Sequence, residues 1–189
     1  MNLSEKRFCI FGIQGSGKTV LMHHILRHYP KHLVVTPHHD EYKGCNRYLP
    51  TYKQYTGAAI EEINMVINKV VIPAAKKREI SLFAIDEANT WTPNKQIMPR
   101  GIKDLNDNSR HYHLSFGVIA RRPTQIHTDL VELAHHLFVF RLTGKNDYQY
   151  LESIVEGLGD VVRKLAPYHF ALVDEHRNIE VIQPVPLRG

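Results

Sequence analysis

The chain has 189 residues, of which 43% are hydrophobic and 23% charged, the composition of an ordinary folded protein rather than a disordered or disulfide-rich one. Two cysteines are too few for a disulfide framework or a zinc quartet, and no apolar stretch approaches the roughly 20 residues of a membrane-spanning helix. The net charge of +5 permits contact with nucleic acid without establishing it; because no signal peptide is evident, we expect a single intracellular domain over residues 1–189.

Short apolar runs alternate with stretches of helical periodicity along the chain. They predict strands at residues 6–11, 32–36, 80–86, 113–120 and 137–142, and helices at residues 18–28, 58–71, 128–135, 147–158 and 160–165. The remaining predictions are an irregular segment at residues 40–54 and a terminal β-hairpin formed by residues 169–173 and 179–183. This alternation favours an α/β fold with a mostly parallel central sheet flanked by helices.

Residues 12–19 read GIQGSGKT, a complete match to the phosphate-loop pattern GxxxxGK[S/T]. Glycines let the backbone turn its N–H groups inward around phosphate oxygens, and the start of the following helix adds positive potential. The lysine would reach the β- and γ-phosphates of ATP, and the threonine hydroxyl would bind Mg²⁺. Because the motif lies between a predicted strand and a predicted helix, it indicates a nucleotide site rather than an ordinary glycine turn. The residues assigned to this site are Gly12, Gln14, Gly15, Ser16, Gly17, Lys18, Thr19 and Val20.

An acidic pair, Asp86 and Glu87, closes the apolar run at residues 80–86. Asp86 would hold Mg²⁺ directly or through water, and Glu87 would polarise the attacking water as a general base. Taken alone, the pair fits solvated acids at a strand end equally well. Beside a phosphate loop, it favours hydrolysis of ATP over transfer of phosphate to a small acceptor.

Arginines flank the predicted strand at residues 113–120. Arg121 follows the strand, where a polar side chain can detect the γ-phosphate if this strand neighbours the one that carries Asp86. Arg110 precedes the strand, where it could reach the nucleotide of a neighbouring subunit and neutralise charge on the transferred phosphoryl group. The alternative for both arginines is ordinary surface charge.

Together these motifs resemble the HerA–FtsK superfamily of P-loop motor ATPases. The resemblance rests on GIQGSGKT at residues 12–19, LFAIDEAN at 82–89, SRHYHLSFGVIARRPTQIH at 109–127 and LAHHLFVFRL at 133–142. It implies an additional-strand P-loop fold with a catalytic glutamate, and a ring, usually a hexamer, that moves double-stranded DNA through its centre. Arg121 stands where the family's sensor carries glutamine, and Arg110 matches the usual place of its trans-acting arginine.

Within the superfamily, the small size and the Arg-Arg-Pro sequence are most similar to the genome-packaging ATPases of membrane-containing icosahedral viruses. This resemblance implies packaging of a genome into a preformed capsid, location in the host cytoplasm and with the virion, and contact with capsid-vertex or inner-membrane proteins. The alternatives are a phage assembly or secretion ATPase of the zonula-occludens-toxin-like type, a nucleotide-dependent switch with little turnover, and a phosphotransferase.

Two segments are candidates for contact with DNA. Residues 40–55 interleave tyrosines with basic residues, a combination that also fits a polar excursion packed by its own rings. The loop expected at residues 90–107 carries Lys95, Arg100 and Lys103, which could contact phosphates without reading sequence. The thirteen histidines show no metal-binding spacing, so we expect no metal site among them.

Overall fold

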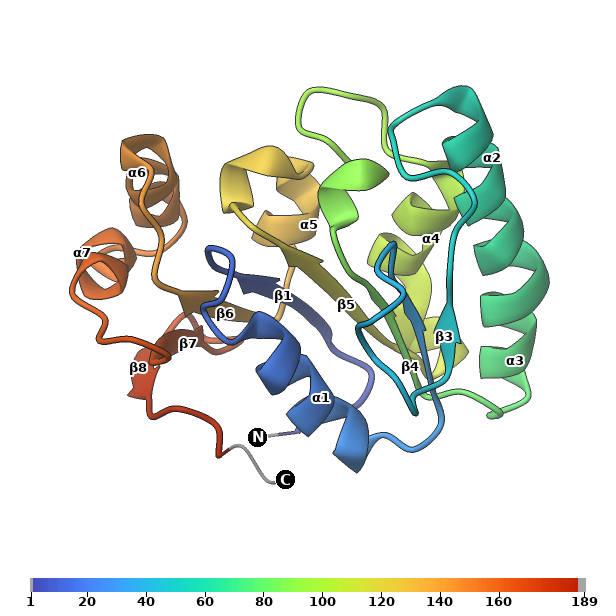
Figure 1. Cartoon of the computed structure of the whole chain (residues 1–189), viewed down its shortest axis with the longest axis horizontal. Helices are drawn as coiled ribbons and strands as arrows, with labels where there is room; N and C mark the ends of the chain where they lie inside the picture. Colours follow the sequence, from blue (N-terminus) through green and yellow to red (C-terminus); the bar gives the residue numbers. More distant parts are fainter. Residues whose placement is uncertain (1, 187–189) are drawn as a thin grey trace.

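The structure, a computed structural model, describes residues 2–186. Over these residues the chain forms an eight-stranded sheet in the order β3-β2-β4-β5-β1-β6-β7-β8 (Figure 1). Strands β1 to β6 pair in parallel, and β7 and β8 add an antiparallel hairpin at one edge. The predicted α/β class, mostly parallel sheet and C-terminal hairpin are therefore confirmed. The strands are β1 (Arg7–Phe11), β2 (His32–Val35), β3 (Arg47–Tyr48), β4 (Leu82–Ile85), β5 (Ser115–Ala120), β6 (His136–Phe140), β7 (Phe170–Val173) and β8 (Ile179–Ile182).

Helices cover both faces of the sheet (Figure 1). Helix α1 (Lys18–His28) packs on one face, where Leu21 and Met22 join the buried cluster that includes Phe8 and Ile10 of β1. The other helices contribute to a second cluster, on the opposite face. They are α2 (Gly57–Val66), the π-helical turn η1 (Ile67–Val71), α3 (Ile72–Lys76), α4 (Arg100–Asn108), α5 (Thr128–Glu132), α6 (Lys145–Ile154) and α7 (Leu158–Arg163).

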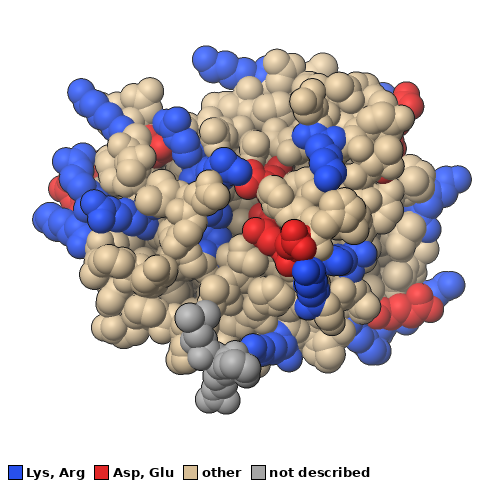
Figure 2. All heavy atoms as spheres, in the orientation of Figure 1, with Lys and Arg blue, Asp and Glu red and all other residues tan. Residues whose placement is uncertain are grey.

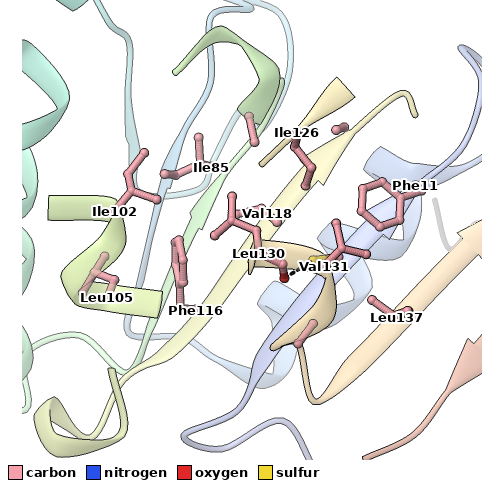
Figure 3. Close-up of a cluster of buried hydrophobic side chains, with 14 of the residues drawn as sticks. Phe11, Ile85, Ile102, Leu105, Phe116, Val118, Ile126, Leu130, Val131 and Leu137 are labelled. Carbon is pink, nitrogen blue, oxygen red and sulfur yellow. Dashed lines mark hydrogen bonds between the residues drawn. The ribbon is translucent and has the colours of Figure 1, made fainter. Parts of the chain in front are cut away.

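The central strands are buried on both faces because their side chains alternate between the two clusters. In β5, Phe116 and Val118 pack toward Ile102 and Leu105 of α4 (Figure 3). Burying each large apolar side chain of this kind contributes about 1.5–3 kcal/mol. The carboxyl ends of β1, β4, β5 and β6 are thus held firmly, and the loops that leave them lie along one edge of the sheet.

Three sequence predictions need correction at the level of single elements. The expected loop at residues 90–107 contains α4, a short and mostly polar helix in which Ile102 and Leu105 are buried. The expected irregular segment at residues 40–54 contains the two-residue strand β3, paired with β2. Strand β5 begins at Ser115 rather than at residue 113, because His113 adopts a left-handed conformation (φ 55°) at the end of a 3₁₀ turn.

Predicted helices also begin or end at different residues. The helix expected at residues 58–71 continues through η1 into α3. Pro73 has no backbone N–H to donate to the regular α-helical hydrogen-bond pattern, and the wider π turn η1 lies just before it. Gly157, with φ 82°, separates α6 from α7, so the expected helix at residues 147–158 ends at Ile154 and the next helix begins at Leu158.

Candidate active site

The phosphate loop connects β1 to α1. Gly17 caps the helix in a left-handed conformation (φ 109°, ψ 5°) that side chains disfavour, which explains the glycine at this position. Lys18 begins the helix, and its ammonium group donates hydrogen bonds to the loop carbonyls of Gly12 (2.7 Å) and Ile13 (3.0 Å). These bonds hold the loop closed around the lysine and leave one of its three protons for a further acceptor.

The loop is tightly packed at its start and open at its tip. A Cβ atom on Gly12 would lie 2.5 Å from Ser16 Oγ and 2.6 Å from Phe140 Cβ, so only glycine fits there. Ser16 Oγ is buried without a hydrogen-bond partner in the described chain, whereas Gln14 and Gly15 are exposed. Thr19 and Val20 lie half-buried in the first turn of α1. The loop therefore presents its backbone N–H groups and Lys18 to one open side.

Asp86 directly follows β4 and is buried, with only 5% of its surface exposed. Burial, together with the neighbouring carboxyl group of Glu41, raises the pKa of Asp86 to about 7. Burial also lowers the pKa of Lys18, while Asp86 and Glu87 act in the opposite direction. The lysine and the acids thus lie close enough to influence each other's charge.

Within residues 2–186, no basic side chain lies within ion-pairing distance of the Asp86 carboxylate. Its hydrogen bond comes from the backbone N–H of Glu87, at 2.9 Å. A buried carboxylate without a cation is costly, because desolvation is not offset by a neighbouring positive charge. The carboxylate of Asp86 and the nearby hydroxyl of Thr19 are oxygen ligands of the kind that Mg²⁺ prefers, so the residues present fit this metal.

Glu87 adopts a left-handed conformation (φ 50°, ψ 47°) that is rare outside glycine and is often found at functional sites. Arg121, which follows β5, donates a hydrogen bond from Nε to Glu87 Oε1 at 3.1 Å. His38 Nε2 lies 3.8 Å from the same oxygen. Strands β4 and β5 are neighbours, as the interpretation of Arg121 as a sensor requires. The candidate general base and the candidate sensor are therefore in direct contact.

Arg122, the next residue, points to a different partner. Its Nε donates to Asp147 Oδ2 at 2.7 Å, and the Thr124 hydroxyl donates to Asp147 Oδ1 at 2.6 Å. Asp147 belongs to the first turn of α6 and is fully buried. This arrangement anchors the segment after β5 to α6 and fixes the place where Arg121 leaves the sheet.

Arg110 lies in the 3₁₀ turn η3 (Ser109–Tyr112), at the opposite end of β5 from Arg121. It is exposed, and within residues 2–186 its side chain makes no hydrogen bond or ion pair. The length of β5 separates Arg110 from the phosphate loop of its own chain. Its predicted role at the nucleotide of another subunit stays a prediction.

The candidate DNA-contacting segments differ in how much basic surface they offer. Lys95, Arg100 and Lys103 are exposed, although Lys103 forms an ion pair with Asp107 at 2.8 Å. In the segment 40–55, Lys43 and Lys53 are exposed, Lys43 forms an ion pair with Asp40 at 2.9 Å, and Arg47 donates to the backbone carbonyls of His39 and Glu41. On the face seen in Figure 2, acidic side chains gather near the centre, and lysines and arginines are scattered around them.

Sequence reasoning did not find two residues that shape the site, Glu41 and Tyr42. Glu41 faces Asp86 and borders the cleft beside Lys18 and Thr19. Tyr42 is buried, with 1% of its surface exposed, and burial and the acids Asp86 and Glu41 raise its pKa well above the ordinary value. No motif marks either residue, because they reach the site from a separate, irregular segment of the chain.

Within residues 2–186, the structure shows no cluster of three or more histidine, cysteine, aspartate or glutamate side chains that could hold a metal ion by themselves. A metal at Asp86 would therefore depend on the Thr19 hydroxyl, a nucleotide or water for its remaining ligands. In the same part of the chain, no helix is both long and apolar enough to cross a membrane.

No protein-family model and no curated protein matched the sequence. Solved structures do match. B204, the DNA-packaging ATPase from Sulfolobus turreted icosahedral virus, aligns with a TM-score of 0.84 and 17% identity over 98% of this chain and 100% of that chain. The genome packaging NTPase B204 from Sulfolobus turreted icosahedral virus 2, in complex with ATP-gammaS, aligns with a TM-score of 0.83 and 16% identity over the same shares of both chains.

The chain has the fold of these packaging ATPases. A third structure, the pCW3 conjugation coupling protein TcpA, aligns with a TM-score of 0.68 and 14% identity over 96% of this chain and 60% of that chain. The P-loop NTPase fold predicted from the sequence is confirmed. The resemblance to viral packaging ATPases of the HerA–FtsK type is confirmed as a likeness of fold.

Proposed function

We propose that the protein is a Mg²⁺-dependent ATPase that drives packaging of double-stranded DNA into a viral capsid. One observation carries this proposal. The phosphate loop, Asp86, Glu87 and Arg121 follow the carboxyl ends of three neighbouring strands, β1, β4 and β5, where Arg121 contacts Glu87 and both acids influence the charge of Lys18. The B204 structures support the packaging role, since they combine this fold with bound ATP analogues and with genome packaging in those viruses.

The loop and the metal ligands would bind the triphosphate. Backbone N–H groups of the loop and the ammonium group of Lys18 would hold the phosphate oxygens, with Ser16 supplying a buried hydroxyl. Thr19 and Asp86 would hold Mg²⁺, which neutralises negative charge on the β- and γ-phosphates when bound. Binding of the cation would give the buried Asp86 carboxylate the positive partner that the protein itself does not supply.

Glu87 would act as the general base. It would take a proton from water as the water oxygen bonds to the γ-phosphorus and the bond from that phosphorus to the ADP oxygen breaks. In the structure, Arg121 occupies one oxygen of Glu87. A γ-phosphate competing for the Arg121 guanidinium would release this oxygen, so that the base becomes free when ATP is present.

The remaining parts of the proposal concern assembly. A single domain would form a ring homo-oligomer, a hexamer by the family resemblance, in which Arg110 acts at the nucleotide of the adjacent subunit. Double-stranded DNA would pass through the centre, contacted by the exposed lysines and arginines at residues 95–103. Such a ring would work in the host cytoplasm and at the virion, docked on capsid-vertex or inner-membrane proteins.

The test is steady-state phosphate release from ATP, with and without linear duplex DNA, for the wild type and for Glu87→Gln. Several-fold stimulation by DNA, lost in the variant, would support the motor. Release that depends on Glu87 but not on DNA would retain the ATPase and contradict DNA coupling in the isolated protein. Tightly held ATP without sustained release would favour the switch, to which the contact between Arg121 and Glu87 lends support.

A further inference from the structure

A cleft of about 610 Å³ adjoins the phosphate loop, and its far side is not explained by phosphate or metal binding. The near side consists of the loop and the first turn of α1. The far side is apolar and aromatic: it is lined by Phe140 at the end of β6, Tyr168 before β7, and residues 184–186 after β8. The volume falls within the range of about 300–1,000 Å³ that is usual for small-molecule sites.

The two aromatic rings lie directly against the phosphate loop. A Cβ atom on Gly17 would be 3.2 Å from the Phe140 ring and 3.8 Å from the Tyr168 ring. The Phe140 ring is buried and braced by Phe170, at a centroid distance of 5.0 Å. The Phe140 ring is therefore a rigid part of the cleft wall and packs closely against the loop that would hold the phosphates.

Tyr168 is placed there at an energetic cost. It is 60% exposed, so it gains little from burial, and its backbone has φ 64°, in the left-handed region that a bulky residue rarely adopts. The segment 184–186 is held in place through its neighbour: His169 Nε2 and Gln183 Oε1 lie 2.9 Å apart in a hydrogen bond that joins the residue directly after Tyr168 to the residue directly before the segment. An exposed aromatic ring on a strained backbone, in the same cleft lining as an anchored apolar segment, is an arrangement that a bound ligand would explain.

The segment 184–186 reads Pro-Val-Pro. Neither proline has a backbone N–H, so the segment offers one backbone donor, that of Val185. The polar side chains at the cleft, Lys18, Thr19 and Glu41, belong to its phosphate and metal side. The far side thus offers flat and apolar surface. Apart from the Tyr168 hydroxyl and the backbone carbonyls of residues 184–186, the described part of this side has no side-chain amide, carboxylate or cation that could read the edge of a ligand by hydrogen bonds.

We propose that this aromatic end of the cleft binds the base of the nucleotide, and that it holds purines by stacking with little discrimination between adenine and guanine. The proposal rests on the nucleotide site proposed above and adds the residues that would bind its base. A purine has a flat ring system that stacks on tyrosine and packs against proline. A site without hydrogen-bond readers lacks the large penalties that reject a related ligand elsewhere.

The experiment measures dissociation constants in the presence of Mg²⁺ for ATP, GTP and CTP, and for inorganic tripolyphosphate, which has no base. The variant is Tyr168→Ala, which keeps a non-glycine residue at the strained position and removes a mostly exposed ring. Tyr168→Phe retains the ring. Tyr52→Ala is the matched control, since Tyr52 is also an exposed tyrosine (46%) but does not line the cleft.

We expect Tyr168→Ala to weaken ATP and GTP binding about tenfold and to leave tripolyphosphate binding unchanged. Tyr168→Phe and Tyr52→Ala should bind as the wild type does, with ATP and GTP within about tenfold of each other and CTP weaker. Equal binding of ATP by Tyr168→Ala and the wild type, or an equal loss for ATP and tripolyphosphate, would overturn the base site alone. A wild type that binds neither ATP nor tripolyphosphate would overturn the proposed function as well.

Discussion

Two buried aspartates at the same edge of the sheet have opposite surroundings. Asp147 receives hydrogen bonds from Arg122 and Thr124, which satisfy both of its oxygens. Asp86 has no basic partner within the described chain, faces a second carboxyl group on Glu41, and has a pKa raised to about 7. The fully paired aspartate joins two elements of the fold, whereas the unpaired one leaves a charge imbalance that a bound cation would relieve.

The largest expected effect comes from Asp86→Asn. If Asp86 holds Mg²⁺, the amide should lower the rate of ATP hydrolysis on the order of a thousandfold, because the metal loses its protein carboxylate. The protein should fold at least as stably as the wild type, since an uncompensated buried carboxyl group is removed. Phosphate release as a function of Mg²⁺ concentration, together with urea denaturation, measures both quantities. Activity near that of the wild type would remove Asp86 from the metal site.

Arg122→Ala should mainly affect stability. The substitution leaves the buried Asp147 carboxylate without its cation. Because Arg122 is itself 43% exposed and Thr124 still donates to Asp147, we expect a loss of about 2 kcal/mol in the free energy of unfolding. Urea denaturation at neutral pH gives this value. A loss below about 1 kcal/mol would show that Asp147 does not depend on Arg122, and the contrast between the two aspartates would lose its basis.

The contrast between Asp86 and Asp147 also predicts that the free energy of unfolding depends on pH. The folded protein holds the Asp86 proton up to about pH 7, whereas the unfolded chain releases it near pH 4, so stability attributable to this group falls as the pH rises between these values. Between pH 5 and pH 7 the wild type should lose about 2 kcal/mol more than Asp86→Asn. The difference between the two denaturation series isolates this residue from the histidines, and parallel series would contradict the raised pKa.

The smallest effect is expected for Arg121→Gln, which also introduces the glutamine found in the sensor of the HerA–FtsK ATPases that the sequence resembles. Arg121 is half-exposed and its ion pair with Glu87 is reached by solvent, so the free energy of unfolding should change by less than about 1 kcal/mol. Arg121 thus serves as the neighbouring control for Arg122 in the same denaturation assay. A loss as large as that of Arg122→Ala would mean that the contact with Glu87 is structural.

Functional groups that lie in consecutive residues could be predicted from the sequence. The phosphate loop and the acids after β4 are contiguous motifs, and the main strands that position them are continuous apolar runs. Glu41 could not be found in this way, because it reaches Asp86 from an irregular segment more than forty residues away. The same holds for Asp147, whose pairing with Arg122 depends on how β5 and α6 are placed in space. The roles assigned to the site residues stay predictions.

The short elements β3 and α4 were not predicted from the sequence, for a different reason. Strand β3 has two residues, which are too few for a period to be recognised, and α4 is a nine-residue helix made mostly of polar residues, a composition that also fits a loop. Tertiary contacts determine both: β3 pairs with β2, and α4 packs against α2 and β5. The helix continues past Pro73 because of a π turn, which no sequence pattern predicted.

Strand β5 has a mechanical consequence for any assembly of this chain. It is buried throughout its six residues and hydrogen-bonded to β4 on one side and β1 on the other, so it resists bending or stretching. The strand is about 20 Å long; the 3₁₀ turn that contains Arg110 precedes it, and Arg121 directly follows it. If the chain forms the proposed ring, the arginine proposed to act at the next subunit and the arginine proposed to detect the γ-phosphate would be connected by one rigid strand. A shift at either end would be transmitted along it to the other.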